Sequence, residues 1–219
     1  MKINITYNKL KNSIVLTKNN YFKVLKNFYK KYYKLKEKDL DISFFVRDKE
    51  ILDDVSLFIK VFNNQSKELI NTYVYDNVCQ KLDEEFQKNN YCKFNCDKCL
   101  GNREKMIAFS ENGCCHSFEY SKFYKPTLIE NIKLCKLLKD KKCTTKNISC
   151  KLFTCRSLKK KGITYNSKKI FLLYTFYDSK QHLIINYNFF KTREELLLKL
   201  NSTTNLPYVF YYMSKQYII

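Results

Sequence analysis

Nine of the ten cysteines in this 219-residue chain lie between Cys92 and Cys155. Residues 90–125 lack hydrophobic periodicity and are expected to form loops, and such a density of cysteines predicts that this region is held together through its thiols. Only two histidines, His116 and His182, are present, which excludes a metal site built mainly from imidazoles. The three glycines stand far apart, so they form neither a dinucleotide-binding motif nor a phosphate-binding loop.

The composition of the chain also indicates a cellular compartment. The first residues are rich in Lys and Asn and lack the apolar core and cleavage site of a signal peptide. The longest apolar run, Ile170–Tyr177, is too short to cross a bilayer. We therefore expect a cytoplasmic protein with no membrane span. Thiols stay reduced there, so the cysteines indicate metal binding or redox chemistry rather than disulfides.

One spacing within the cluster is typical of a metal half-site. In Cys96-Asp-Lys-Cys99, two residues separate the thiols, and this lets both sulfurs reach one ion from a tight turn. Cys79 stands apart in a helical pattern and is expected to be an ordinary buried thiol. Further ligands are available at Cys114, Cys115, Cys135, Cys143, Cys150 and Cys155.

Three stretches carry a family resemblance: Gly113-Cys-Cys-His-Ser-Phe, the stretch Cys135–Cys143, and Ser149-Cys-Lys-Leu-Phe-Thr-Cys-Arg156. Together they resemble the bacterial CxxCxxCC cysteine-cluster proteins described as zinc- or iron-chelating. The resemblance covers about residues 92–160 and implies eight thiolates, the number that two four-thiolate sites use. By position these are Cys96, Cys99, Cys114, Cys115, Cys135, Cys143, Cys150 and Cys155, with Cys92 and His116 as further candidates beside them.

A second interpretation concerns Cys92-x3-Cys96-x2-Cys99. Radical S-adenosylmethionine enzymes use this spacing to hold three irons of a four-iron cluster. Lys98 stands where those enzymes usually have an aromatic residue, no glycine-rich cofactor strand follows, and too few residues remain for a barrel. Thiol spacing alone leaves zinc and an iron–sulfur cluster both open, because both accept four thiolates.

The net charge of +20 has two interpretations. Of the 41 basic residues 37 are Lys, and the excess peaks at +11 in residues 92–161, where the cysteines lie. Lysines beside a cluster of thiolates balance its negative charge. The same surplus suits a nucleic-acid-associated module that binds phosphates without sequence preference, although specific readers favour Arg.

Periodicity predicts a mainly α fold with minor β, as a single domain with a central metal-stapled region. We expect a helical N-terminal region (1–91), the cysteine-cluster region (92–161) and a C-terminal helical segment (162–219). Alternation predicts a short strand near Ile3 and Ile5, and residues 41–47 are ambiguous between strand and loop. Helices are predicted over 21–35, 48–62, 66–88, from Pro126, over 149–161 up to Gly162, over 168–177 and over 196–200 behind a Thr192–Glu195 capping box, with 183–187 strand or helix.

No catalytic arrangement is evident. His182 lies in an apolar run and is expected to be packed, and the adjacent carboxylates diverge around helices. The aromatic residues at helical spacing are expected to form core rather than a stacking platform for single-stranded nucleic acid. The first hypothesis is therefore a metal-binding protein whose metal is mainly structural. A basic nucleic-acid module and an iron–sulfur enzyme are the alternatives.

Overall fold

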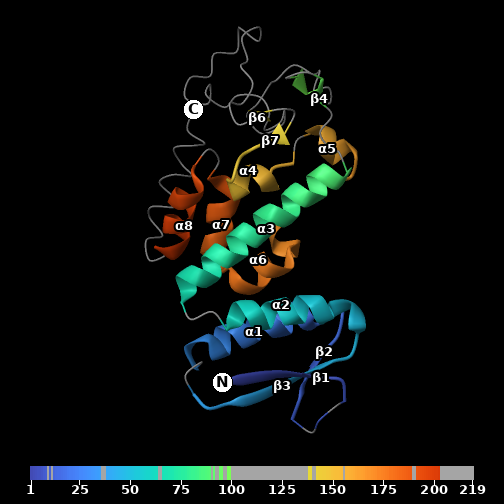
Figure 1. Ribbon diagram of the computed structural model, residues 1–219, viewed down its shortest axis with the longest axis vertical. Helices are drawn as coiled ribbons and strands as arrows, with labels where there is room; N and C mark the ends of the chain where they lie inside the picture. Colours follow the sequence, from blue (N-terminus) through green and yellow to red (C-terminus); the bar gives the residue numbers. More distant parts are fainter. Residues whose placement is uncertain are drawn as a thin grey trace. The chain divides into compact units, whose positions relative to one another are not determined.

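The computed structural model describes residues 1–8, 10, 12–35, 38–63, 66–89, 91, 94–95, 98–99, 138–139, 142–154, 156–188 and 191–202. The chain forms two compact units. The first unit contains residues 1–74 and 168–178, and the second contains residues 75–167 and 179–219. The long helix α3 (Lys67–Asn89) belongs to the first unit up to Val74 and to the second from Tyr75 (Figure 1).

A parallel sheet organises the first unit. Its strands β1 (Lys2–Thr6), β2 (Ile14–Leu16) and β3 (Asp41–Val46) have the order β1-β3-β2. The central strand β3 pairs Phe44 with Ile5 on one side and with Ile14 on the other. The predicted strand near Ile3 and Ile5 is confirmed, and residues 41–47 resolve as a strand.

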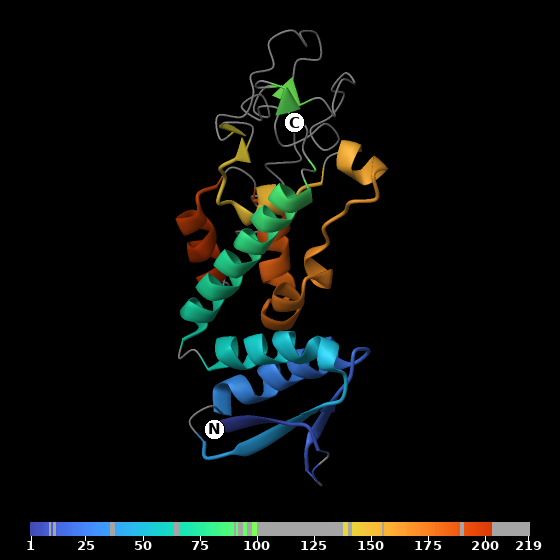
Figure 2. The same ribbon diagram turned by 45° about the vertical axis from the view of Figure 1, so that its right-hand side comes forward.

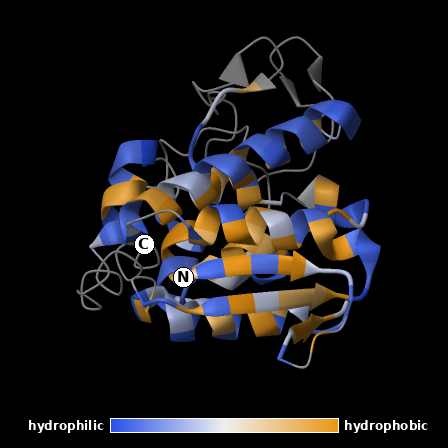
Figure 3. Cartoon of the chain, turned by 60° about the horizontal axis from the view of Figure 1, so that its bottom comes forward, coloured by the Kyte–Doolittle hydropathy of each residue, from blue (hydrophilic) through white to orange (hydrophobic). Residues whose placement is uncertain are grey.

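Side-chain alternation gives this sheet one apolar face. Ile5, Phe44 and Ile14 share a face because they are paired in register. Figure 3 shows this alternation of hydrophilic and hydrophobic residues along the strand that starts at the N-terminus. Helices α1 (Tyr21–Tyr32) and α2 (Leu52–Phe62) lie on the same side of the sheet (Figures 1 and 2).

Aromatic rings fill the space between the sheet and these helices. Phe28 on α1 lies 5.0 Å from Phe44 and 5.4 Å from Phe62, measured between ring centroids. Helix α6 (Phe171–Phe176) adds Phe176, whose ring stacks on Phe58 at 5.4 Å. These side chains are buried, so the expectation that the aromatic residues form core is confirmed for them.

Helices dominate the second unit. Besides α3 from Tyr75, it contains α4 (Ile148–Leu152), α5 (Arg156–Lys160), α7 (Ser179–Tyr187) and α8 (Arg193–Asn201). Helix α7 packs against both α4 and α8. Residues 183–187, which were ambiguous between strand and helix, lie within α7 and are helical.

Short 3-10 turns flank helices in both units. They lie at Tyr33–Leu35, Lys49–Ile51 and Ser167–Lys169.

The helix predicted over 149–161 is wrong as a single element. The chain forms α4 and α5 instead, because Phe153 between them is extended, with ψ of 125°. Next to it Thr154 is buried, and its hydroxyl accepts a hydrogen bond from Tyr165 N at 3.2 Å. This tertiary contact replaces the local helix. The predicted stop at Gly162 is confirmed by its left-handed φ of 76°.

Two predicted helix starts also differ. Asp48 makes no cap bond through its side chain and instead accepts a hydrogen bond from Lys18 N at 2.7 Å. The helix predicted over 168–177 is interrupted at Ile170, where ψ is 118°. In contrast, Ser66 caps α3 by accepting a hydrogen bond from Leu69 N at 3.1 Å.

The structure is mostly helical and contains a small parallel sheet, which agrees with the predicted mainly α fold with minor β. The division at residues 91 and 161 stays a prediction. The loops expected over 90–125 and the helix expected from Pro126 lie largely or wholly outside the described residues. In the described part of the chain, no helix is long and apolar enough to cross a membrane.

Candidate metal centre

Three of the eight predicted ligands lie among the described residues. Cys99 and Cys143 are each the second residue of a strand, and Cys150 lies on α4. The other five, Cys96, Cys114, Cys115, Cys135 and Cys155, lie outside the described residues, as do the further candidates Cys92 and His116.

The backbone around Cys99 forms a tight hairpin. Strand β4 (Phe94–Asn95) runs antiparallel to β5 (Lys98–Cys99), with Phe94 opposite Cys99 and Asn95 opposite Lys98. Only two residues connect the strands, and the first of them in the sequence is Cys96. A two-residue connection turns the chain back on itself, which is the local geometry that a C-x2-C half-site uses.

A second hairpin repeats this pattern. Strand β6 (Leu138–Lys139) pairs antiparallel with β7 (Lys142–Cys143), with Leu138 opposite Cys143 and Lys139 opposite Lys142. Two residues again connect the strands. In each hairpin the second strand is therefore a Lys-Cys dipeptide, and an apolar residue of the first strand lies opposite the cysteine. The side chain of Cys143 is exposed, so a ligand can reach it.

Cys150 lies in the first turn of α4 and is half-buried. Asn147 caps this helix, because its Oδ1 accepts a hydrogen bond from Cys150 N at 2.9 Å. The Nδ2 of the same side chain donates to the carbonyls of Asn188 and Lys191 at 2.9 and 2.7 Å. Asn147 is 2 % exposed, so its side-chain bonds are shielded from water. The position of Cys150 is thus fixed through one buried amide.

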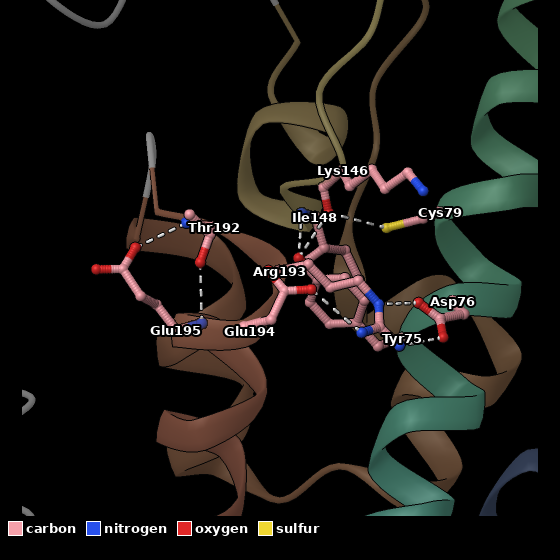
Figure 4. A network of polar contacts seen from close by, with 9 residues as sticks. All are labelled: Tyr75, Asp76, Cys79, Lys146, Ile148, Thr192, Arg193, Glu194 and Glu195. Carbon is pink, nitrogen blue, oxygen red and sulfur yellow. Dashed lines mark hydrogen bonds and ion pairs between the residues drawn. The ribbon is translucent and has the colours of Figure 1, made fainter.

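Tyr75 on α3 holds the same segment from another side (Figure 4). Its hydroxyl donates to the carbonyl of Lys146 at 2.8 Å and accepts a hydrogen bond from Ile148 N at 3.0 Å. Burial raises the pKa of Tyr75 well above its ordinary value, so the hydroxyl keeps its proton. The Sγ of Cys79 lies 3.9 Å from the same Lys146 carbonyl. The expectation of a buried thiol at Cys79 is confirmed.

One buried lysine ties α4 to α3. The ammonium of Lys151 pairs with Asp83, and the lysine side chain is only 6 % exposed while that of the aspartate is 46 % exposed. A buried ammonium without a partner is costly, so this pair fixes where α4 lies along α3. Lys151 directly follows Cys150, which places the anchor beside a predicted ligand.

Helix α8 is attached to α3 by a two-pronged ion pair. The guanidinium of Arg193 reaches both carboxylate oxygens of Asp76, at 2.6 Å from Nε and 2.5 Å from Nη2 (Figure 4). The predicted capping box is confirmed: Thr192 Oγ1 accepts from Glu195 N at 3.1 Å, and Thr192 N donates to Glu195 at 2.8 Å. The backbone bond from Thr192 lowers the pKa of Glu195. Arg193 is therefore the first residue of a well-capped helix, and from the first turn of α8 its side chain reaches Asp76 on α3.

His182 is packed, as expected. Its Nδ1 lies 3.0 Å from Ser167 Oγ, and that hydroxyl also accepts a hydrogen bond from Asn186 at 3.0 Å. Both His182 and Ser167 are buried, so a substrate has no access to the serine oxygen. The pair joins the turn at Ser167 to α7 and gives no nucleophilic site.

Two important side chains were missed by reading the sequence alone. Asn147 precedes Cys150 by three residues, which is the spacing of a helix cap, so a local signal was present. Tyr75 carries no such signal, because both of its partners lie more than seventy residues away along the chain.

Among the residues whose side chains are described, no group of three or more His, Cys, Asp or Glu side chains is placed to hold a metal ion. The eight predicted ligands stay a prediction, and so does the resemblance to the cysteine-cluster proteins. No protein-family model, curated protein sequence or solved structure matches the chain.

Proposed function

We propose that this protein binds metal, preferably zinc, through the thiolates of residues 92–155, and that the metal keeps this segment folded. The observation that carries the proposal is the register of β4 and β5. Phe94 pairs with Cys99 and Asn95 with Lys98, so Cys96 is the first of the two residues that connect these antiparallel strands in the sequence. Two thiolates separated in this way are a suitable half-site for a tetrahedral ion.

The second hairpin supports the same chemistry. Cys143 lies opposite Leu138 in β6–β7, as Cys99 lies opposite Phe94 in β4–β5. Lys98 and Lys142 directly precede the two cysteines, and a positive charge there offsets part of the negative charge of a multi-thiolate site. The second half-site would combine Cys143 with cysteines elsewhere in the segment.

The contacts of Cys150 support a structural role for the metal. Asn147 and Lys151, on either side of Cys150, are buried and bonded to Asn188 and Asp83, which lie elsewhere in the second unit. A ligand mounted on such a rigid anchor joins residues 92–155 to the helices of this unit once metal is bound. Because a structural site is rarely preformed without its ion, metal binding would then contribute directly to folding.

Metal content of the anaerobically purified protein tests the proposal. We expect two zinc ions per chain by elemental analysis, as eight thiolates in two four-thiolate sites require. The double variant Cys96→Ser/Cys99→Ser should lose one ion. Cys79→Ser is the matched control, because Cys79 is buried against Lys146 and outside the cluster, and it should keep both.

Three results would contradict the proposal in different ways. Protein without stoichiometric metal would remove the metal function altogether. Stoichiometric iron with visible charge-transfer absorption would replace zinc by an iron–sulfur cluster. Two zinc ions that persist in the double variant would keep the function but remove Cys96 and Cys99 as ligands.

A further inference from the structure

One helix of the first unit, α1, carries charged side chains of one sign only, and it is remote in sequence from the cysteines. Residues 21–35, which form α1 and the turn after it, contain five lysines and no Asp or Glu. We define the α1 lysine stripe as Lys23, Lys26, Lys30 and Lys34, which follow one another at intervals of three or four residues. At this spacing their side chains project from the same face of the helix.

The charges of the stripe are largely uncompensated. Lys23, Lys30 and Lys34 are exposed, and within the described part of the chain no carboxylate lies within ion-pair distance of their ammonium groups. By comparison, α2 carries Asp53 and Asp54, and α8 mixes both signs. Helices α4, α5, α6 and α7 also lack acidic residues, but each contains at most two basic residues apart from α5, whereas α1 contains four lysines.

Lys26 shows how closely the positive charges gather. Its ammonium lies 4.3 Å from the ring centroid of Tyr174 on α6 and 3.4 Å from the carbonyl oxygen of Tyr177. Burial, and then the positive charge of Lys30, lower the pKa of Lys26; Lys168 acts in the same direction, and Asp178 opposes them. Asp178 and Lys168, both from a distant part of the sequence, act on the pKa of Lys26 in opposite directions, so the repulsion that remains comes from Lys30 on the same helix. A surface that holds like charges together against their repulsion is suited to an anionic partner.

We propose that the α1 lysine stripe binds the phosphate backbone of a nucleic acid without sequence preference. From Lys23 to Lys34 the helix rises about 16 Å at 1.5 Å per residue. This covers the rise of about five phosphates along one strand of a duplex, at 3.4 Å each. The absence of Arg from the stripe fits backbone binding rather than base reading.

A membrane surface fits this stripe less well. A helix that lies in the bilayer interface inserts its apolar face among the lipids. The apolar face of α1 is occupied, since Leu25, Phe28 and Tyr29 are buried in the first unit. A row of lysines on a helix that has no free apolar face to insert into lipid is better suited to binding a linear polyanion.

The test compares two triple variants of the full chain. Lys23→Gln/Lys30→Gln/Lys34→Gln removes three charges from the stripe, and Lys159→Gln/Lys160→Gln/Lys161→Gln removes three exposed charges at the end of α5. Both keep good helix formers and the same net charge. Fluorescence anisotropy of labelled 20-nucleotide single-stranded and 20-base-pair duplex DNA of mixed sequence measures binding at several salt concentrations.

We expect the stripe variant to bind DNA at least about tenfold more weakly at low salt, with a log–log salt slope shallower by about 2 on single strands. The α5 variant should bind like the wild type. Equal losses in both variants, a loss confined to the α5 variant, or no DNA binding at low salt would each overturn the proposal. So would binding to phosphatidylserine-containing vesicles with none to DNA. Matching circular dichroism spectra and melting temperatures establish that both variants are folded.

Discussion

The hydroxyl of Tyr75 lies between two backbone groups of one turn, donating to the Lys146 carbonyl and accepting from Ile148 N. Replacing it by Phe leaves a buried N–H and a carbonyl without this partner. We expect Tyr75→Phe to lower the free energy of unfolding by about 1–3 kcal/mol. Urea denaturation measures the loss. Tyr7→Phe is the control, since Tyr7 is 66 % exposed, and a similar loss there would contradict the role given to Tyr75.

Asn147 offers a test that separates capping from its other bonds. Asn147→Asp keeps an oxygen for Cys150 N but turns a carboxylate oxygen toward the carbonyls of Asn188 and Lys191. We expect Asn147→Asp to be at least as destabilising as Asn147→Ala, each by about 1–3 kcal/mol. Thr192→Ala, at the exposed capping box, should cost about 1 kcal/mol. An aspartate variant as stable as the wild type would mean that the Nδ2 bonds contribute little.

Two ion pairs of opposite burial make a further comparison. Asp83→Asn leaves the ammonium of Lys151 buried without its charge partner, whereas Glu50→Gln breaks a pair with Lys18 whose side chains are 71 % and 67 % exposed. We expect Asp83→Asn to cost about 1–3 kcal/mol, below the range for fully buried pairs because Asp83 is half-exposed. Glu50→Gln should leave the stability nearly unchanged, because both partners are solvated. Thermal melts at two salt concentrations distinguish them, and equal losses would contradict the burial argument.

Cys79 predicts how stability changes at alkaline pH. Burial raises the pKa of its thiol from 9.0 to about 12. Because the unfolded thiol ionises first, the stabilisation is complete below pH 9 and is lost as the pH rises from 9 to 12. Cys79→Ser should leave the free energy of unfolding nearly unchanged at pH 7. Serine does not titrate between pH 9 and 12, so the variant lacks this pH-dependent loss.

Relative to this variant, the wild type should lose about 1 kcal/mol by pH 10, since a full pKa unit is worth 1.36 kcal/mol. Urea denaturation under reducing conditions at pH 7, 9 and 10 follows the difference. Parallel pH dependence in the two proteins would mean that the Cys79 thiol ionises as easily in the folded state as in the unfolded one.

Local sequence patterns predicted most of the helices. The spacing of Leu25, Phe28 and Tyr32 indicated α1, and Thr192 with Glu195 indicated the start of α8. Both signals lie within a few residues of the structure they specify. The strand β2 was not predicted, because three residues show no period and Ile14 becomes a strand residue only by pairing with Phe44.

The same limit applies to the candidate site. The spacing of Cys96 and Cys99 predicted a half-site, and the strand register adds a hairpin around it. Asn147, which caps the helix of Cys150, has a local sequence signal, but Tyr75 and Asp83 were not visible in the sequence because they act across the fold. The break between α4 and α5 has the same cause, since the hydroxyl of Thr154 accepts a hydrogen bond from Tyr165 N, eleven residues away, and the chain does not continue as a helix there.

The order of synthesis has a consequence for the first unit. Among the residues that the structure describes, strands β1 and β2 pair with β3 alone, so neither can join this sheet until Val46 has left the ribosome. The ring of Phe176 arrives later still, because residues 168–178 complete a unit whose other part ends at Val74. At a synthesis rate of 5–20 residues per second, that wait lasts roughly 5–20 s. During it, Phe58 and Tyr29 lack the ring of Phe176 that packs on both of them in the folded unit, so the aromatic core of this unit is completed only after more than half of the second unit has been synthesised.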